Sequence, residues 1–286
     1  MNSCQKYFTA GVLALLTQAA FAQAPSLGAA SGFAVLAGTA VTCTAGSVVG
    51  NVGVSPGSAF TNTGCTVTGS TPPATNAVAA SARAAFLSAY ATLQSRACTD
   101  NSLLPTIPVS TTLRPGVYCS NTALTATDVT LTLDARGDSN AVWIFKIGGA
   151  LTGTNFTVAM VNGAKPCNVF WVPADATTMT TSALKGNIVA GGPALGSITL
   201  TGGSLAGRAL ANIAVTMTGT GASVIGCSAL ADPTGGAGNS CKDDDDDDRD
   251  HHHGKKHGKK HGGHDGDRDD DRDDDRGHTK NFYERK

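Results

Sequence analysis

The stretch Leu151-Thr152-Gly153-Thr154-Asn155-Phe156-Thr157 recurs in degenerate form along the chain. Its common form is an apolar residue, a threonine, two small or hydroxylated residues, a small or polar residue and a second apolar residue. The copies begin at Cys43, Leu124, Leu151, Met179, Leu200 and Met217. From Leu124 onward they start 27, 28, 21 and 17 residues apart, a spacing typical of repeats that stack into a solenoid. The irregular spacing predicts coils of unequal length.

The repeat also predicts where its threonines point. Side chains alternate along an extended strand, so Thr152 and Thr154 point outward if Leu151 points into the core. Stacked coils would then carry two files of hydroxylated side chains on one face. We predict that the first file contains Thr125, Thr152, Thr180, Thr201 and Thr218. We predict that the second contains Thr127, Thr154, Ser182 and Thr220, with Gly203 as its gap.

The two ends of the chain differ from its middle. Lys6, the apolar run 11–16 and the A-x-A pattern at 20–22 predict a signal peptide over 1–22, cleaved after Ala22, and hence a secreted protein. Residues 23–228 predict one solenoid domain, and residues 229–286 an Asp/His/Lys/Arg-rich tail that we expect to be disordered.

Charge is concentrated in that tail. Of the 21 Lys and Arg residues 12 lie in 242–286, as do 16 of the 22 acidic residues and all 7 His. The body therefore carries no basic footprint for nucleic acid, and it contains no apolar run long enough for a membrane span. The tail offers Asp and His to divalent cations or to a cell surface, but it lacks an ordered ligand spacing, which favours a solvating extension.

One segment changes period. From residue 74 to 97 the apolar residues fall at helical spacing in an Ala-rich background, which predicts a single helix. The runs 142–145 and 169–172 are continuously apolar, as in strands that are covered on both sides. We therefore expect the helix to pack on these strands and the two Trp to lie in the core, rather than to form a sugar-stacking platform.

Seven Cys follow the signal peptide, and export makes disulfides plausible. We expect the pairs Cys43–Cys65, Cys98–Cys119 and Cys167–Cys227, with Cys241 left alone. The sequence does not fix this connectivity, and Cys43 also fits a buried thiol at the apolar position of its repeat.

The body contains few residues that could act in enzymatic catalysis. Residues 53–57 match the G-x-S-x-G pattern of serine hydrolases, but the body lacks a His to act as base, and Pro56 disfavours the turn that this pattern needs. Asp134 and Asp138 could pair for glycoside chemistry, although Asp and Gly at these positions are better explained as turn residues. The sequence predicts no catalytic residue, no metal ligand and no cofactor.

The two threonine files are the remaining candidate for a binding site, and strand propensity alone could also explain them. Threonine favours strands, so a solenoid can carry it outward without binding anything. An ordinary solvated strand face, however, uses charged side chains for solubility. Here charge intrudes only at Asp128, Lys185 and Arg208, late in their copies. A flat, uncharged array of stiff side chains suits a repeating partner such as a crystal plane or a regular polymer.

Six ordered motifs support a specific interpretation. The segments 27–36, 50–56, 115–118, 131–135, 140–145 and 167–171 together resemble the DUF3494 ice-binding protein family, and the likeness covers about 27–226. The resemblance implies a mostly β fold: a discontinuous right-handed β-solenoid of triangular cross-section with one long α-helix packed alongside. It also implies secretion and adsorption to ice through one flat face.

Some family members carry T-A/G-x-T/N on that face. Residues 152–155 match this motif fully, residues 125–128, 44–47 and 201–204 match in part, and residues 218–221 lose its last position. The ice-binding residues that we predict are Thr125, Thr127, Thr152, Thr154, Asn155, Thr180, Ser182, Thr201, Ser204, Thr218 and Thr220.

The leading hypothesis is a secreted, monomeric, non-enzymatic protein whose partner is the ice surface. A second hypothesis is an adhesion or matrix protein that uses the solenoid as a scaffold and the tail for attachment. A third is a carbohydrate-active solenoid enzyme, which the shortage of acid–base residues disfavours.

Overall fold

The computed structural model describes residues 24–99 and 105–230. The chain divides into compact units 1–237 and 238–286, and the described residues all belong to the first. The predicted signal peptide, Cys241 and residues 231–286 lie outside the described residues. Within the described part, no helix is long and apolar enough to cross a membrane.

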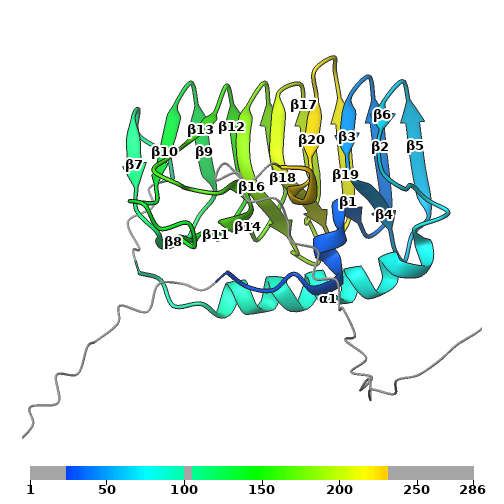
Figure 1. Cartoon of the computed structure of the whole chain (residues 1–286), viewed down its shortest axis with the longest axis horizontal. Coiled ribbons are helices and arrows are strands. Elements are labelled where there is room, and N and C mark those ends of the chain that lie inside the picture. Colours follow the sequence, from blue (N-terminus) through cyan, green and yellow to red (C-terminus); the bar gives the residue numbers. More distant parts are fainter. Residues whose placement is uncertain (1–23, 100–104, 231–286) are drawn as a thin grey trace, which may run out of the picture. The chain divides into compact units, whose positions relative to one another are not determined.

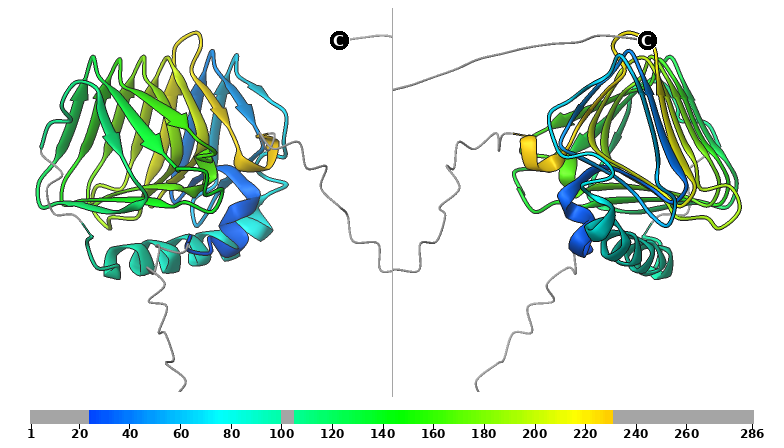
Figure 2. Two further views of the ribbon diagram at one scale, coloured as in Figure 1. Left: turned by 60° about the vertical axis from the view of Figure 1, so that its left-hand side comes forward. Right: turned by 90° about the vertical axis from the view of Figure 1, so that its right-hand side faces the viewer.

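The described residues form a mostly β solenoid with three flat flanks, which gives it the triangular section seen in Figure 2. All its strand pairs are parallel, as stacked coils require. The seven-stranded flank consists of β5 (Ala59–Thr63), β2 (Ala40–Thr44), β19 (Ala214–Thr218), β17 (Ile198–Thr201), β15 (Thr177–Thr180), β12 (Leu151–Thr154) and β9 (Leu124–Thr127), in that spatial order.

The other two flanks share one 13-stranded sheet that bends where the long strands β16 (Ala183–Ala190) and β18 (Ser204–Ala211) turn the corner. What we call the mixed flank is made by β6 (Thr66–Val67), β3 (Ser47–Val49), β20 (Ser223–Ile225), the first halves of β18 and β16, β13 (Thr157–Val161), β10 (Thr130–Asp134) and β7 (Thr111–Leu113). The helix-covered flank is made by β4 (Asn51–Val54), β1 (Phe33–Ala37), the second halves of β18 and β16, β14 (Val169–Pro173), β11 (Trp143–Ile147) and β8 (Gly116–Ser120).

Alternating apolar residues fill the inside of the triangle. One contiguous cluster contains the inward side chains of all three flanks. Trp143 and Trp171 are fully buried, and the rings of Phe145 and Trp171 stack with centroids 4.1 Å apart. The expectation that both Trp belong to the core is confirmed.

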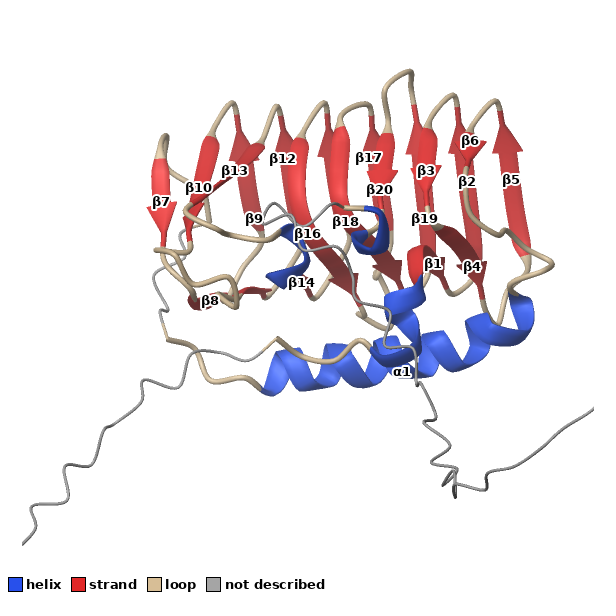
Figure 3. Cartoon of the chain, viewed as in Figure 1, coloured by secondary structure: helices blue, strands red, loops and turns tan. Residues whose placement is uncertain are grey.

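Helix α1 (Asn76–Ser95) runs along the row of strands on one flank (Figures 1 and 3). It falls within the predicted segment 74–97. Its buried side chains, among them Phe86 and Leu93, pack in a second cluster with the outward residues Ile144 and Phe170 of β11 and β14. The two continuously apolar runs therefore lie beneath the helix, as predicted, because their strands are covered on both sides.

The order of the coils in space differs from their order in the chain. The last strands, β18, β19 and β20, pair with the first, β1, β2 and β3. The 20-residue helix, about 30 Å long, carries the chain from the coils at one end of the stack to β7 at the other. This is the discontinuous arrangement that the family resemblance implied.

Three disulfides join Cys43 to Cys65, Cys98 to Cys119 and Cys167 to Cys227, so the expected pairing is confirmed. Three short 3₁₀ helices complete the described structure: η1 (Gly28–Gly32), η2 (Pro166–Asn168) and η3 (Cys227–Ala229).

Candidate ice-binding face

Every strand of the seven-stranded flank carries the same five-residue pattern. It reads Ala-apolar-Thr-x-Thr, with Ser in place of Ala once and Thr in place of the apolar residue once. The seven copies are 40–44, 59–63, 123–127, 150–154, 176–180, 197–201 and 214–218. Both threonines of each copy point away from the core, and none of them is buried.

The strand register aligns these threonines across the whole flank. The first file contains Thr125, Thr152, Thr178, Thr199, Thr216, Thr42 and Thr61. The second contains Thr127, Thr154, Thr180, Thr201, Thr218, Thr44 and Thr63. The alanines and the serine that open each copy form a third file of shorter side chains beside the threonines. The pairing of Ala214, Ala40 and Ala59 shows this alignment.

The resulting surface is flat, regular and uncharged. Parallel strands place neighbouring threonines about 4.8 Å apart between coils and about 6.6 Å apart along a strand. None of the seven strands contains a charged residue. Because χ1 of a β-branched residue is stiff, the methyl and hydroxyl groups are held in fixed positions. The hydroxyls of Thr201 and Thr218 also lie 3.3 Å apart, within hydrogen-bonding distance.

The underside and the edge of the flank keep it flat. The residue between the two threonines faces the core and is buried in every strand except the terminal β5, where Asn62 occupies the position. At Gly153 a Cβ atom would lie 2.5 Å from the sulfur of Met179, so glycine there leaves room for the neighbouring coil. After the second threonine every strand ends on a residue with positive φ, which turns the chain into the mixed flank. These residues are Ala45, Gly64, Asp128, Asn155, Thr181, Gly202 and Gly219.

Seven of the predicted residues lie on this flank. Thr125, Thr127, Thr152 and Thr154 occupy the predicted files. Thr180, Thr201 and Thr218 were assigned to the first file, which is wrong, since they pair in the second file with Thr154.

The cause of this error is a shift of two residues in the alignment of the repeats. Met179, Leu200 and Met217 were matched to Leu151, but they lie between the two threonines, where Gly153 lies in β12. A shift of two residues leaves each side chain on the same side of a strand. The outward orientation was therefore right although the file was wrong.

The other four predicted residues lie off the flat surface. Ser182 is buried at the corner, where its hydroxyl donates to the Thr180 carbonyl at 3.0 Å and accepts from the Phe156 amide at 3.2 Å. Ser204 belongs to the mixed flank, because it opens β18 and pairs with Ser223. Thr220 lies in the turn after β19. Their predicted places in or beside the files came from the same two-residue shift.

Asn155 lies at the corner that borders the threonine files. Its side-chain amide donates to the Asp128 carboxylate at 2.8 Å, and its carbonyl oxygen accepts a hydrogen bond from the Thr181 hydroxyl. These three residues have positive φ and form a short polar ladder along the edge of the flank. Asp128 therefore lies at the corner, outside the uncharged surface.

The prediction missed seven outward threonines, namely Thr42, Thr44, Thr61, Thr63, Thr178, Thr199 and Thr216. Of these, only Thr44 had been noted, as part of a partial motif. The signal that finds all of them is the spacing Ala/Ser-x-Thr-x-Thr, which requires no apolar residue at the second position. In β15 that position is Thr177, which is buried.

Asp134 and Asp138 serve as turn residues. The Asp134 carboxylate accepts from the Arg136 amide at 2.9 Å and from the Asn162 side chain at 2.7 Å, and Asp138 accepts from the Asn140 amide at 2.8 Å. The hydrogen bonds from Asn162 and from the Arg136 amide hold the pKa of Asp134 below its ordinary value.

The comparison with known proteins agrees with this geometry. The family model described as "Ice-binding-like" matches residues 35–222, a range that contains all seven strands of the flank. The chain belongs to the ice-binding-like family.

Relatives within this family and solved structures resemble the chain over most of its described part. An "Ice-binding protein" of Nostoc sp. (strain HG1) is 40% identical over 207 residues, which cover 70% of this chain and 74% of the relative. The crystal structure of an ice-binding protein from an Antarctic biological consortium is 32% identical with a TM-score of 0.64, covering 73% of this chain and 93% of the other. The ice-binding protein of the Antarctic ascomycete Antarctomyces psychrotrophicus is 28% identical with a TM-score of 0.62, covering 71% and 98%.

Proposed function

We propose that this chain binds ice through the seven-stranded flank and that adsorption there inhibits ice growth and recrystallisation. The observation that carries the proposal is the unbroken register of two threonines on each of seven coils, on a surface without charge. Membership of the ice-binding-like family supports it.

The geometry offers a physical basis for adsorption. Each threonine presents a methyl group that favours ordered water beside it and a hydroxyl that can hydrogen-bond to that water. A single contact of this kind contributes little. A rigid array makes many contacts at once and loses little conformational freedom on binding, so small contributions add up.

The proposed ice-contacting residues are the two threonines of each strand. We propose that the chain acts outside the cell, as the signal-like segment 1–22 suggests, as a monomer and without catalysis. The relatives give the adhesion alternative no support, since they bear the names of ice-binding proteins.

A pair of matched substitutions tests the proposal. Thr199 lies in the central region of the flank on β17, and Thr157 opens β13 on the mixed flank; both are half-buried. Thr199→Lys places a long hydrated cation in the middle of the files. We expect ice-affinity partition of the full-length protein to fall at least about tenfold, equivalent to ~1.4 kcal/mol.

Thr157→Lys is the control and should leave partition unchanged. Both variants should retain the fold, because surface substitutions usually change the free energy of unfolding by less than about 0.5 kcal/mol. Equal partition of the two folded variants would remove the flank from the proposed role.

A further inference from the structure

One coil of the solenoid is built from both ends of the folded chain. β20 lies between β18 and β3 on the mixed flank, and β1 lies between β18 and β4 on the helix-covered flank. The two strands occupy the same coil, but no peptide segment connects them at the corner. The chain leaves at Gly226 into η3 and enters β1 from η1. The two ends are close, since a Cβ at Gly226 would lie 3.0 Å from the Ala34 Cβ.

At this corner two other coils place an asparagine directly after a glycine. The pairs are Gly50-Asn51 and Gly186-Asn187. Asn51 donates to the Gly32 carbonyl at 2.9 Å and accepts from the Ser70 amide at 2.9 Å. Asn187 donates to the carbonyls of Cys167 and Val169, both at 3.0 Å. Each asparagine therefore connects its coil to a neighbouring one.

Two coils flank the missing link: one carries Gly50-Asn51, and the other carries Gly207-Arg208 in place of the Gly-Asn pair. The Arg208 side chain is 9% exposed. Its Nε and Nη2 donate to the Ser31 carbonyl at 3.1 and 2.9 Å, and its Nη1 donates to the Asn187 Oδ1 at 3.0 Å. These partners are neutral, so a buried cation is held by a carbonyl and an amide oxygen; burial lowers the pKa of Arg208.

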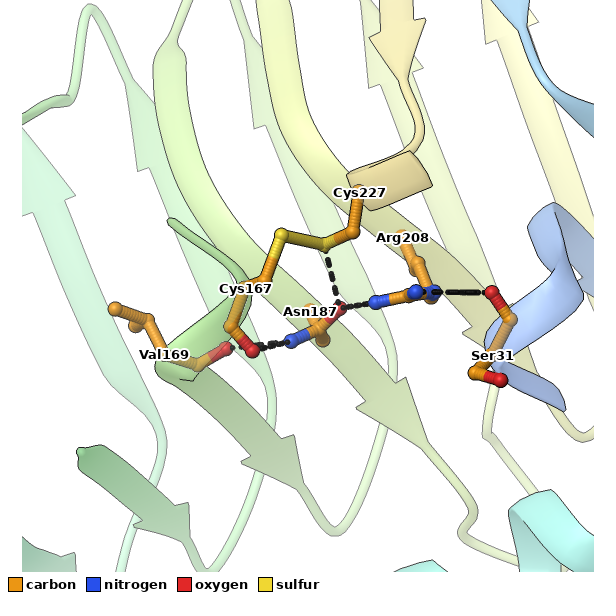
Figure 4. Close-up of a disulfide and its surroundings, with 6 residues drawn as sticks. All are labelled: Ser31, Cys167, Val169, Asn187, Arg208 and Cys227. Atoms are coloured by element: carbon orange, nitrogen blue, oxygen red, sulfur yellow. Dashed lines mark hydrogen bonds between the residues drawn. A yellow bond between two sulfur atoms is a disulfide. The ribbon is translucent and has the colours of Figure 1, made fainter. Parts of the chain in front are cut away.

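The disulfide completes the connection (Figure 4). Cys227, the first residue of η3 on the departing segment, is bonded to Cys167 in η2. The Cys167 carbonyl accepts from Asn187, and the Cys227 sulfur lies 3.6 Å from the Asn187 Oδ1. The entering segment, two central coils and the departing segment thus meet around Asn187 and Arg208.

We infer that Arg208, with the Cys167–Cys227 disulfide, takes the place of the missing peptide link and is a positioning residue for the threonine files. The inference rests on the proposed function where it concerns ice. β19 precedes β20 and β2 follows β1, so the alignment of Thr216 with Thr42 depends on how the two chain ends are held. Both files cross this boundary.

Arg208→Met tests the inference, because it keeps the apolar stem and removes every donor. We expect amide hydrogen exchange in β1, β2 and β20 of the full-length protein to accelerate about tenfold or more, the effect of losing a hydrogen bond to a charged group, while β9 and β12 keep their rates. Ice-affinity partition should fall with it. Arg208→Lys, which retains the charge but not the two-pronged contact, should give an intermediate result.

Two further variants separate positioning from general stability. Leu93→Ala removes buried side-chain volume from α1 and should lower stability without a selective change in β1, β2 and β20. Ala34→Cys with Gly226→Cys places a covalent link across the break, and once oxidised it should restore both exchange and partition to the Arg208→Met protein.

Uniform acceleration across all strands in Arg208→Met, or failure of the verified 34–226 disulfide to restore the selective change, would overturn the inference. If the unaltered protein does not partition into ice, the proposed function fails. The exchange measurement then still decides whether Arg208 aligns the two chain ends.

Discussion

The seven-stranded flank and the mixed flank are made by the same coils with the same spacing, yet their outward rows differ. On the mixed flank one row contains Thr130, Thr157, Ala183, Ser204, Ser223, Ser47 and Thr66, a mixture of Thr, Ser and Ala. The neighbouring row contains Thr132 and Ala159 and continues with Lys185, the buried Ala206, Ile225 and Val49. On the seven-stranded flank both corresponding rows are threonine throughout.

This difference argues against strand propensity as the sole cause of the outward threonines. If strand propensity alone placed threonine outward, it would act on both flanks, since both are parallel sheets of one solenoid. Stacking thus tolerates varied residues, including a lysine, at equivalent outward positions. The uniform rows require a cause specific to one flank, and a flat repeating partner supplies one.

The largest expected effect on stability comes from substituting core residues that lie beneath the two flanks. Leu200 and Leu205 belong to one coil on either side of a corner, and both are buried in the same cluster. Leu200→Ala and Leu205→Ala should each lower the free energy of unfolding by about 2–5 kcal/mol, measured by denaturant titration. Only Leu200→Ala undermines the threonine rows, so only it should reduce ice partition at a temperature where both variants are folded. Equal loss of partition would mean that stability alone explains it.

A smaller effect separates the methyl from the hydroxyl group. Thr199→Ser removes one methyl group, worth about 0.8 kcal/mol if it is fully buried against ice, so ice affinity should fall by up to about fourfold. Thr199→Val keeps the shape and removes the hydroxyl. Thermal hysteresis at matched concentrations ranks the two contributions, and Thr157→Ser on the mixed flank is the control that should show no change.

The smallest effect is the response to pH. Hydrogen bonds from Asn162 and the Arg136 amide depress the pKa of Asp134 in the folded state, so its stabilising contribution is present above the ordinary value of 3.8 and is lost as the pH falls below it. Asp134→Asn should therefore be slightly less stable than the unaltered protein near neutral pH, and the difference should vanish in acid.

The seven-stranded flank should not share this response. Its strands contain no ionisable group, so ice partition should stay constant between about pH 5 and 9. A titration step in partition within that range would assign a role to a charged group outside the flank.

Much of the fold could be predicted because its signals are local. The helix follows from apolar spacing, and the covered strands follow from the continuous runs around Trp143 and Trp171. The exact files could not be predicted in the same way. Met179 and Leu151 are equally apolar, and both point inward, so period-two alternation cannot tell which of them begins a copy.

The break in the composite coil is a different kind of feature. It depends on which distant strands pair, as β18 with β1 and β19 with β2, and no periodicity within either segment encodes that choice. The sequence does mark the break, because Arg208 follows the corner glycine where two other coils have asparagine. The reason for this arginine can be inferred only once the neighbouring strands are known.

The composite coil also determines how the domain can be attached to other molecules. In a triangular prism the edge shared by two sides faces away from the third, and η3, which follows β20, lies at the edge opposite the seven-stranded flank (Figure 2). A fluorescent protein, a solid support or a second domain joined after η3 would leave the outer surface of β2, β17 and β12 unobstructed. Immobilised arrays prepared this way would all present the same plane to freezing water.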